Sequence, residues 1–144
     1  MCYKIAILIS VSCLAQEAAA PSVEEAVAPV YPTLAVVGRV SGSVIVDAHV
    51  SERGVVSSAA AGEGDAMLRQ ASLDAARLWR FHAQTGERDV KLIFSFRLMP
   101  KETPEAQLGS VFRPPYTVEV RKINPGPVRH VARAGGPARD THPD

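Results

Sequence analysis

Cysteine is scarce in this chain of 144 residues, because the only two, Cys2 and Cys13, both lie near its N-terminus. If that segment is removed, the remaining chain has no thiol for a disulfide, a zinc–thiolate centre or a nucleophile. Charge of one sign is also scarce, since 16 basic and 15 acidic residues leave a net charge of +1. A chain without a strong field of either sign is not predicted to bind nucleic acid.

Long apolar runs are missing too, since none reaches the roughly 18 residues that a membrane-spanning helix needs. The first 20 residues instead combine a basic start at Lys4, the apolar run IAILISVSCLA and an Ala-x-Ala ending at Ala20. This order predicts a cleaved signal peptide over residues 1–20, and therefore a secreted protein with no transmembrane helix in its mature form. Two alternatives stay open: an uncleaved N-terminal anchor, and a lipid attached to Cys13 as in bacterial lipoproteins.

The rest of the chain divides by composition. Residues 21–29 hold two prolines and two glutamates and are predicted to be a linker. The compact domain is predicted over residues 30–98, followed by a loop and an extra strand within 99–123. Residues 124–144 mix glycine, proline and charge without an apolar period, so they are predicted to be a disordered tail.

A hairpin is predicted near the start of the compact domain. Ser43–Val50 alternates apolar and polar side chains, with Val44 and Val46 on the inner face, as in a half-buried strand. The turn Ser51–Gly54 ends in a glycine, which adopts a positive φ at little cost, and a second strand returns from Val55.

A helix follows the hairpin. Asp65 is suited to its N-cap, and apolar or small side chains recur after it at steps of three and four residues. These side chains are Leu68, Ser72, Ala75, Ala76 and Trp79. We expect Leu68 and Trp79 to belong to the core, and the small residues to let the helix lie close to a sheet.

The clearest strand prediction is Asp89–Leu98. Its inward side chains include Leu92, Phe94 and Phe96. Its outward side chains are Lys91, Ile93, Ser95 and Arg97. After a long loop, Tyr116–Lys122 is predicted as a further, peripheral strand. One main helix packed on one face of a small antiparallel sheet of three to four strands gives an α+β fold.

No set of residues in the sequence is arranged for catalysis or metal binding. Ser57, Ser58, Asp65 and His82 are residue types of a hydrolase, but no nucleophile elbow or His-Glu-x-x-His motif accompanies them. His49 and His82 are far apart and have no further ligand at metal-binding spacing. The sequence therefore predicts a protein that is not an enzyme, with no catalytic residue, cofactor or metal.

Five short motifs, taken in order, resemble the C-terminal domain of TonB-family proteins. They are Tyr31-Pro32, Gly42–Val44, Arg53–Val55, the segment Leu68–Phe81 that ends in Trp-Arg-Phe, and VKLIFSF from Val90. The resemblance covers the chain from Val30 to Leu98. It implies a periplasmic module that binds proteins.

In that family the domain contacts TonB-dependent outer-membrane transporters, and it grips the partner peptide by adding a strand to the edge of its sheet. The partner implied is such a transporter or another envelope protein. The residues that we expect to bind it are Tyr31, Pro32, Lys91, Ile93, Ser95 and Arg97. The alternative for the first two is structural, with Tyr31 capping the sheet and Pro32 starting a helical turn. The alternative for the strand residues is an ordinary edge that is protected by its charges against aggregation.

Two departures from the family leave a second function open. Energy-transducing members carry a membrane anchor and a long spacer, whereas a removable signal and the short segment 21–29 are predicted here. In addition, Tyr116–Lys122 lies outside the resemblance, and if it pairs with Val90–Leu98 it occupies the edge that a peptide would use. The alternative is a structural or dimerisation module of the cell envelope. In it this strand completes the sheet, or is exchanged between two chains of a homodimer.

Overall fold

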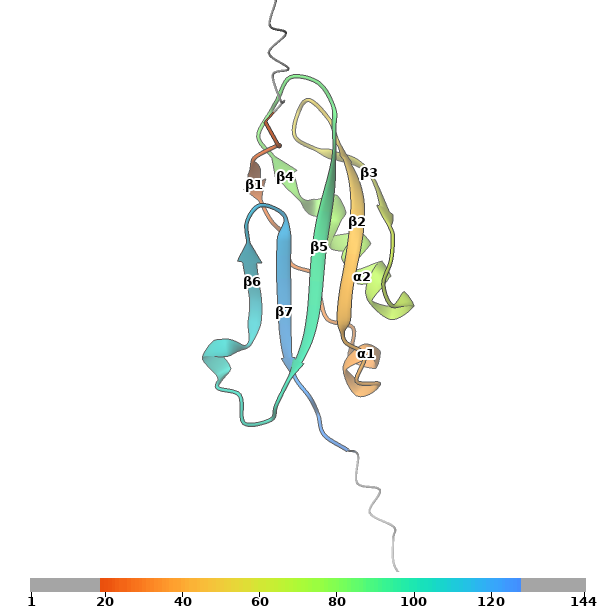
Figure 1. Cartoon of the computed structure of the whole chain (residues 1–144), viewed down its shortest axis with the longest axis vertical. Coiled ribbons are helices and arrows are strands. Elements are labelled where there is room, and N and C mark those ends of the chain that lie inside the picture. Colours follow the sequence, from red (N-terminus) through yellow and green to blue (C-terminus); the bar gives the residue numbers. More distant parts are fainter. Residues whose placement is uncertain (1–18, 128–144) are drawn as a thin grey trace, which may run out of the picture.

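The computed structural model describes residues 19–127, which form a five-stranded sheet with both helices behind it (Figure 1). The elements are β1 (Val23–Glu25), α1 (Thr33–Val37), β2 (Gly42–Val50), β3 (Val56–Ala61), α2 (Ala66–Leu78), β4 (Arg80–Phe81), β5 (Arg88–Met99), the 3-10 helix η1 (Glu105–Gln107), β6 (Gly109–Arg113) and β7 (Thr117–Ile123). Two segments lie outside the described residues. They are residues 1–18 of the predicted signal peptide, which include Cys13, and residues 128–144 of the predicted tail.

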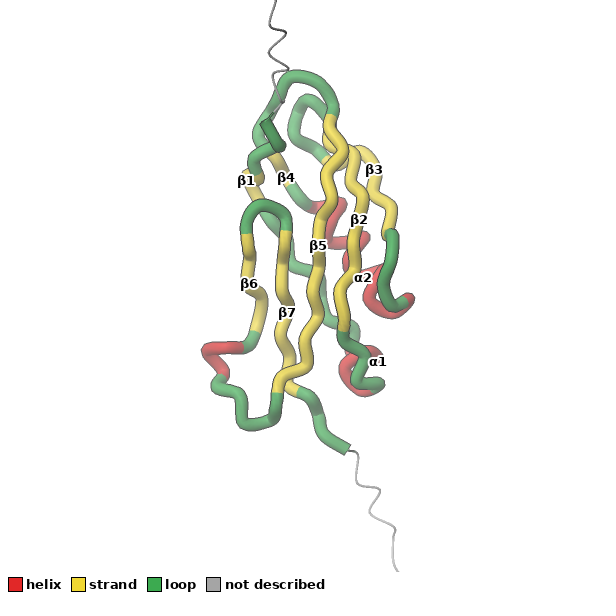
Figure 2. The backbone as a smooth tube through the Cα atoms, viewed as in Figure 1, coloured by secondary structure: helices red, strands yellow, loops and turns green. Residues whose placement is uncertain are grey.

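The large sheet has the strand order β3-β2-β5-β7-β6 (Figure 2). β2 runs antiparallel to both β3 and β5, whereas β7 runs parallel to β5 and β6 returns antiparallel to β7. The predicted α+β fold with one main helix is confirmed. The sheet differs from the prediction in having five strands instead of three to four, and in being mixed, since one of its pairings is parallel.

Helix α2 lies against the sheet through a face of small and apolar side chains. Asp65 caps its N-terminus, where the carboxylate accepts a hydrogen bond from the backbone N–H of Met67 at 2.8 Å. The buried residues of the helix and its C-cap are Leu68, Ser72, Ala75, Ala76 and Trp79. The hydroxyl of Ser72 donates to the carbonyl of Leu68, so this buried polar group costs little.

The core lies between the sheet and α2. The seven residues predicted for it are all fully buried: Val44, Val46, Leu68, Trp79, Leu92, Phe94 and Phe96. The indole N–H of Trp79 donates to the carbonyl of Val27 at 2.8 Å, and its ring meets Phe94 edge to face at 6.0 Å between centroids. Trp79 therefore joins the helix, the sheet and the N-terminal segment.

The turn between β2 and β3 requires a glycine. Gly54 has a φ of +80°, and a Cβ at this position would lie 1.7 Å from the carbonyl oxygen of Phe81. Its own carbonyl accepts a hydrogen bond from the N–H of Phe81 at 2.8 Å. The hairpin turn is thus fixed against Phe81 of β4, and no residue larger than glycine fits at position 54.

Residues 21–29, predicted to be a linker, are part of the folded unit. β1 pairs antiparallel with β4, with Val23 opposite Phe81, and Val27 and Ala28 pack against the core. The side chains of this segment explain the difference, because Pro21 and Pro29 are buried and the apolar residues between them pack against the core.

Residues 99–123, predicted to be a loop with one peripheral strand, hold η1 and the hairpin of β6 and β7. β7 is not peripheral, since Val118 and Val120 are only 2% and 4% exposed and belong to the core. The alternation of Val118 and Val120 with polar neighbours is that of a strand with one buried face.

Candidate functional site

β5 is not an edge strand, although its outward side was predicted to be the docking edge. β2 flanks it in antiparallel register, and β7 flanks it in parallel register from Ile93 opposite Thr117 to Met99 opposite Ile123. A partner cannot add a strand to β5 while β7 is paired with it. The prediction of a docking edge at this strand is therefore corrected, because the chain's own C-terminal strand satisfies the main-chain groups there.

The predicted binding residues of β5 lie on the open face of the sheet, which is the face away from both helices. Lys91 donates to the carboxylate of Asp47 at 2.6 Å, and Ser95 accepts from the opposite serine of β2 at 3.3 Å. Ile93 is 37% exposed between them. These side chains are accessible from solvent, but the polar groups of Lys91 and Ser95 already have partners on β2.

Tyr31 and Pro32 do not join this group. Tyr31 is only 4% exposed, its hydroxyl donates to the carbonyl of Val40 at 2.6 Å, and its ring meets Phe96 edge to face at 5.1 Å. Burial raises the pKa of Tyr31 above its ordinary value. Pro32 is the N-cap residue of α1. Since Phe96 faces the helices, the structure separates Tyr31 from the predicted binding residues of β5.

A buried carboxylate joins the last three strands of the sheet. Glu119 of β7 is 6% exposed, and its Oε1 accepts a hydrogen bond from Nε of Arg121 at 2.7 Å. Its Oε2 forms an ion pair with Nη2 of Arg113 on β6 at 3.1 Å. Nη1 of Arg97 on β5 lies 3.5 Å from Oε1. We call these four side chains the arginine cluster.

The arginine cluster carries an excess of positive charge. The hydrogen bond from Arg121 holds the pKa of Glu119 below its ordinary value, against the effect of burial, and the other two arginines add to this. Three guanidinium groups and one carboxylate leave two positive charges. The side chains of Arg97 and Arg113 are 62% and 58% exposed, so this excess faces solvent on the open face.

Sequence reasoning missed the arginine cluster. On the sequence alone Arg121 has no predicted role, and Arg97 is interpreted as a binding residue or, alternatively, as a charge that protects an edge. A signal was present, since Glu119 stands between two valines of an alternating segment and Arg121 follows on the same face. A carboxylate at such a position needs a cation nearby, because burying it alone is costly.

β6 is the free edge of the sheet next to this cluster. Within residues 19–127 it pairs with β7 alone, and all five of its residues are exposed. On the helix side, Phe112 is 42% exposed and its ring lies 6.0 Å from that of Trp79. On the open face, Val111 is 36% exposed and Arg113 reaches back to Glu119.

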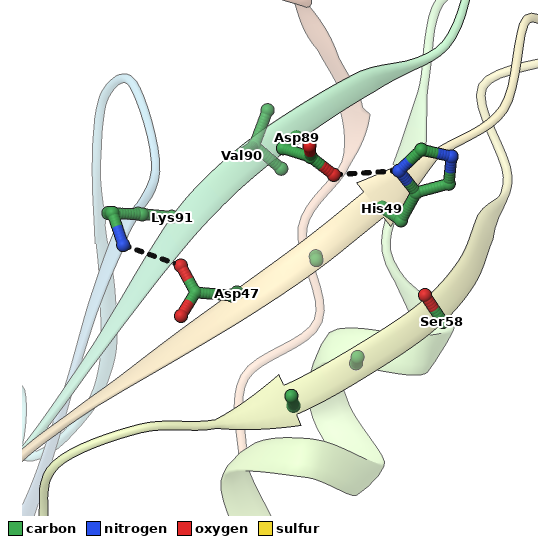
Figure 3. A pocket seen from close by; sticks show the side chains of 9 residues that line it. Asp47, His49, Ser58, Asp89, Val90 and Lys91 are labelled. Atoms are coloured by element: carbon green, nitrogen blue, oxygen red, sulfur yellow. Dashed lines mark hydrogen bonds and ion pairs between the residues drawn. The ribbon is translucent and has the colours of Figure 1, made fainter.

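β3 is the opposite edge and has a different character. In the described chain it pairs with β2 alone, and from Ser57 to Ala61 it carries only serine and alanine. A shallow hollow on the open face lies over these small residues, with Lys91 and Asp47 at one end and His49 at the other (Figure 3). This edge offers neither an aromatic side chain nor a charge of its own.

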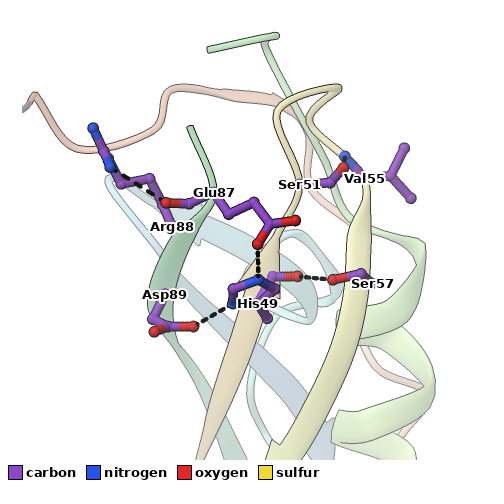
Figure 4. A network of polar contacts seen from close by, with 7 residues as sticks. All are labelled: His49, Ser51, Val55, Ser57, Glu87, Arg88 and Asp89. Carbon is purple, nitrogen blue, oxygen red and sulfur yellow. Dashed lines mark hydrogen bonds and ion pairs between the residues drawn. The ribbon is translucent and has the colours of Figure 1, made fainter. Parts of the chain in front are cut away.

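His49 bridges two carboxylates at the end of this hollow (Figure 4). Its Nδ1 lies 2.7 Å from Oδ1 of Asp89, and its Nε2 lies 3.0 Å from Oε2 of Glu87. These hydrogen bonds, first that with Asp89, raise the pKa of His49. His49 can donate to both carboxylates at once only as the imidazolium, in which both ring nitrogens carry a proton. The sequence spacing gave no carboxylate near His49, since both come from the neighbouring strand and its entry.

Neither a membrane span nor a metal centre is found among residues 19–127. None of the helices there is both long enough and apolar enough to cross a bilayer. The same residues contain no group of three or more His, Cys, Asp or Glu side chains that could hold a metal ion.

Comparison with protein families matches residues 27–98 to the family described as Gram-negative bacterial TonB protein C-terminal. The chain belongs to this family. A comparison with curated proteins found no match. TonB proteins serve energy transduction in the envelope of Gram-negative bacteria, so this TonB-type domain is a component of that envelope. The match runs from the segment before α1 into β5, and leaves out β6 and β7. The strand that closes β5 is therefore outside the matched family region.

Proposed function

We propose that this TonB-type chain is a non-enzymatic protein-binding module of the periplasm, which takes up an extended segment of a partner by strand addition at β6. The observation that carries this proposal is the unpaired main-chain edge of Gly109–Arg113, whose residues are all exposed within the described chain. An exposed edge strand presents N–H and C=O groups that an extended peptide can satisfy.

Family membership supports the class of partner. We propose a TonB-dependent outer-membrane transporter or another envelope protein, met after export by the predicted signal peptide and linked to transport across the outer membrane. Strand addition uses main-chain hydrogen bonds and needs few special side chains. For this reason the proposal includes no catalytic residue and no cofactor.

β6 is favoured over β5 on energetic grounds. A peptide that docked on β5 would first have to displace β7, which exposes Val118 and Val120 and separates Glu119 from Arg97. Each buried apolar side chain of this size stabilises the fold by about 1.5–3 kcal/mol. Docking on β6 carries no such cost, because that edge is already open.

A second function is favoured by the β5–β7 ladder itself. In this alternative the domain is a structural or dimerisation module of the envelope, and its C-terminal strand fills the edge of the sheet permanently. β7 occupies seven register positions along β5, from Ile93 to Met99, which is the arrangement that such a module requires. The contact at β6 would then be a second copy of the chain.

Site-specific photo-crosslinking in intact cells separates these functions. A photoreactive amino acid in place of Ser110 tests the β6 edge, and the same residue in place of Ser58 tests the β3 edge, since both serines are exposed. We expect position 110 to crosslink to an envelope protein and position 58 to give a clearly weaker yield. Crosslinks only between two copies favour the dimerisation module. An absence of crosslinks from position 110 contradicts binding at β6.

A further inference from the structure

The two faces of the β6 edge differ in chemistry, and this restricts the sequence of a strand that can add to it. In a sheet, side chains of neighbouring strands that point to the same face lie side by side. A strand beside β6 therefore presents one row of side chains to the open face, next to Val111 and Arg113. It presents the other row to the helix side, next to Phe112.

On the open face, the neighbouring charge is positive. Arg113 belongs to β6 itself and is 58% exposed, so it lies directly beside the incoming strand. At the other end of β6, Gly109 has no side chain, and Arg121 opposite it extends towards the carbonyl of Gln107 at 3.5 Å. A long side chain of the incoming strand can therefore reach across Gly109 to Arg121, because no side chain of β6 lies between them.

Other charges near this end do not remove the excess. Glu105 and Lys122 line the same hollow as Gly109 and Arg121, and their opposite charges offset each other. The two positive charges left by the arginine cluster therefore remain available to carboxylates of a partner.

On the helix side, the neighbouring surface is apolar. Phe112 is 42% exposed and adjoins a hollow lined by Pro115, Tyr116, Pro21 and Val23, among other residues. An apolar side chain of the incoming strand that enters this hollow removes aromatic and proline surface from water.

A second copy of this chain does not meet these requirements. If two β6 strands paired antiparallel around Val111, Arg113 of each copy would face Gly109 of the other, next to its Arg121. If they paired in parallel and in register, Arg113 would face Arg113. Both arrangements bring two positively charged clusters together, and like charges on paired strands are destabilising.

From these contacts we infer that the partner segment alternates acidic and apolar residues, with its carboxylates on the open face beside Arg113 and Arg121 and its apolar side chains against Phe112. This inference rests on the proposed function and specifies the chemistry of its partner. The arginine cluster holds β7 in place through Glu119 and also selects the partner through its unpaired charge.

Three nine-residue synthetic peptides test this inference on the full-length chain. They alternate valine with glutamate, with glutamine or with lysine. An exposed ion pair contributes up to about 1 kcal/mol, so we expect the glutamate peptide to bind more tightly than the glutamine peptide by up to about fivefold for each ion pair that it forms. The lysine peptide should bind most weakly. Hydrogen exchange should show new protection of the β6 amides in the bound state.

Charge variants identify the residues responsible. Arg113→Gln should remove the larger part of the preference for the glutamate peptide over the glutamine peptide. Arg97→Gln removes a charge from the cluster without altering β6 and should reduce the preference in part. Arg53→Gln is the matched control, because Arg53 is an exposed arginine in the turn between β2 and β3, and should keep the full preference.

The outcomes separate the two levels of the proposal. Equal binding of the glutamate and glutamine peptides, with β6 protected, overturns the acidic preference and keeps strand addition at β6. Protection of β3 instead of β6 overturns the site. If no peptide binds and no amide of β6 gains protection, strand addition itself is wrong.

Discussion

The family-matched part of the chain and the C-terminal hairpin of β6 and β7 are stabilised in different ways. The matched part, residues 27–98, contains antiparallel strands and α2, which enclose an aromatic core around Trp79. The hairpin supplies fewer buried side chains. It is attached through the parallel ladder on β5, the arginine cluster around Glu119, and a hydrogen bond from the hydroxyl of Tyr116 to the carbonyl of Pro21 at 2.6 Å.

This difference changes which surface is free for partners. Without the hairpin, β5 would be an edge strand of the sheet, with its charged side chains on the open face beside that edge. With the hairpin in place, the edge moves to β6, which lies outside the family-matched residues. A domain of this family can thus keep its core and acquire a new edge through a short addition after β5.

The largest effect is expected in the core of the matched part. Trp79→Ala should lower the free energy of unfolding by about 3–5 kcal/mol, the range for truncating a large aromatic residue in a core. Urea denaturation followed by circular dichroism measures this change. Leu78→Ala is the matched control, because its neighbour Leu78 is 57% exposed, and it should change stability by less than about 0.5 kcal/mol. Similar losses for both variants would show that the assignment of the buried face is incorrect.

A smaller effect is expected in the arginine cluster. Glu119→Gln keeps the shape of the side chain and removes its charge, which leaves three arginines without their common anion. We expect the free energy of unfolding to fall by about 1–3 kcal/mol. The loss is limited because Arg97 and Arg113 are exposed enough for water to hydrate their guanidinium groups. The variant should also increase hydrogen exchange in β6 and β7 more than in β2. Equal exchange in all strands would contradict a local attachment role.

The pH dependence of the same variant has a definite sign. Because the folded-state pKa of Glu119 is lowered, its contribution to stability is present above the unfolded value, near 4.5. That contribution is lost as the pH falls through the lower folded value. The wild-type chain should therefore lose this part of its stability on acidification, and the Glu119→Gln chain should not. Glu52→Gln, in the exposed turn after β2, is the control and should behave as the wild type does.

The contrast between the two regions also explains what could be predicted from the sequence. Strands β2 and β5 and helix α2 have strong local periods, and Asp65 and Gly54 mark a helix start and a turn. These signals are contained within short windows, so they predict the family-matched fold well.

The remainder depends on contacts between distant segments. The alternation around Val118 predicts a strand, but nothing in the sequence specifies that it pairs in parallel with β5. The same limit hides the carboxylates of His49, since Asp89 becomes its neighbour only through the β2–β5 register. Proline in residues 21–29 suggests a linker, whereas Val23 and Val27 pack against the core only once it exists.

Two tyrosines provide a matched comparison of the regions. The hydroxyl of Tyr31 in the matched part and that of Tyr116 in the turn of the hairpin each donate to a backbone carbonyl at 2.6 Å. Replacing either by phenylalanine should cost about 1 kcal/mol. The segment that becomes less protected should differ between the two variants. Hydrogen exchange should rise near Val40 for Tyr31→Phe, and near Pro21 for Tyr116→Phe. Unchanged hydrogen exchange near Pro21 in Tyr116→Phe would show that the hairpin is not attached through Tyr116.

The smallest effect is expected at His49, on the open face between β2 and β5. Because the folded-state pKa of His49 is raised, its contribution is fully present below the unfolded value of 6.5 and is lost as the pH rises through the higher folded value. Denaturation midpoints measured across this range should therefore decline slightly for the wild type and not for His49→Gln. Asp89→Asn removes the stronger of the two acceptors and should shift the decline to lower pH. A decline that persists in His49→Gln would assign the pH dependence to another group.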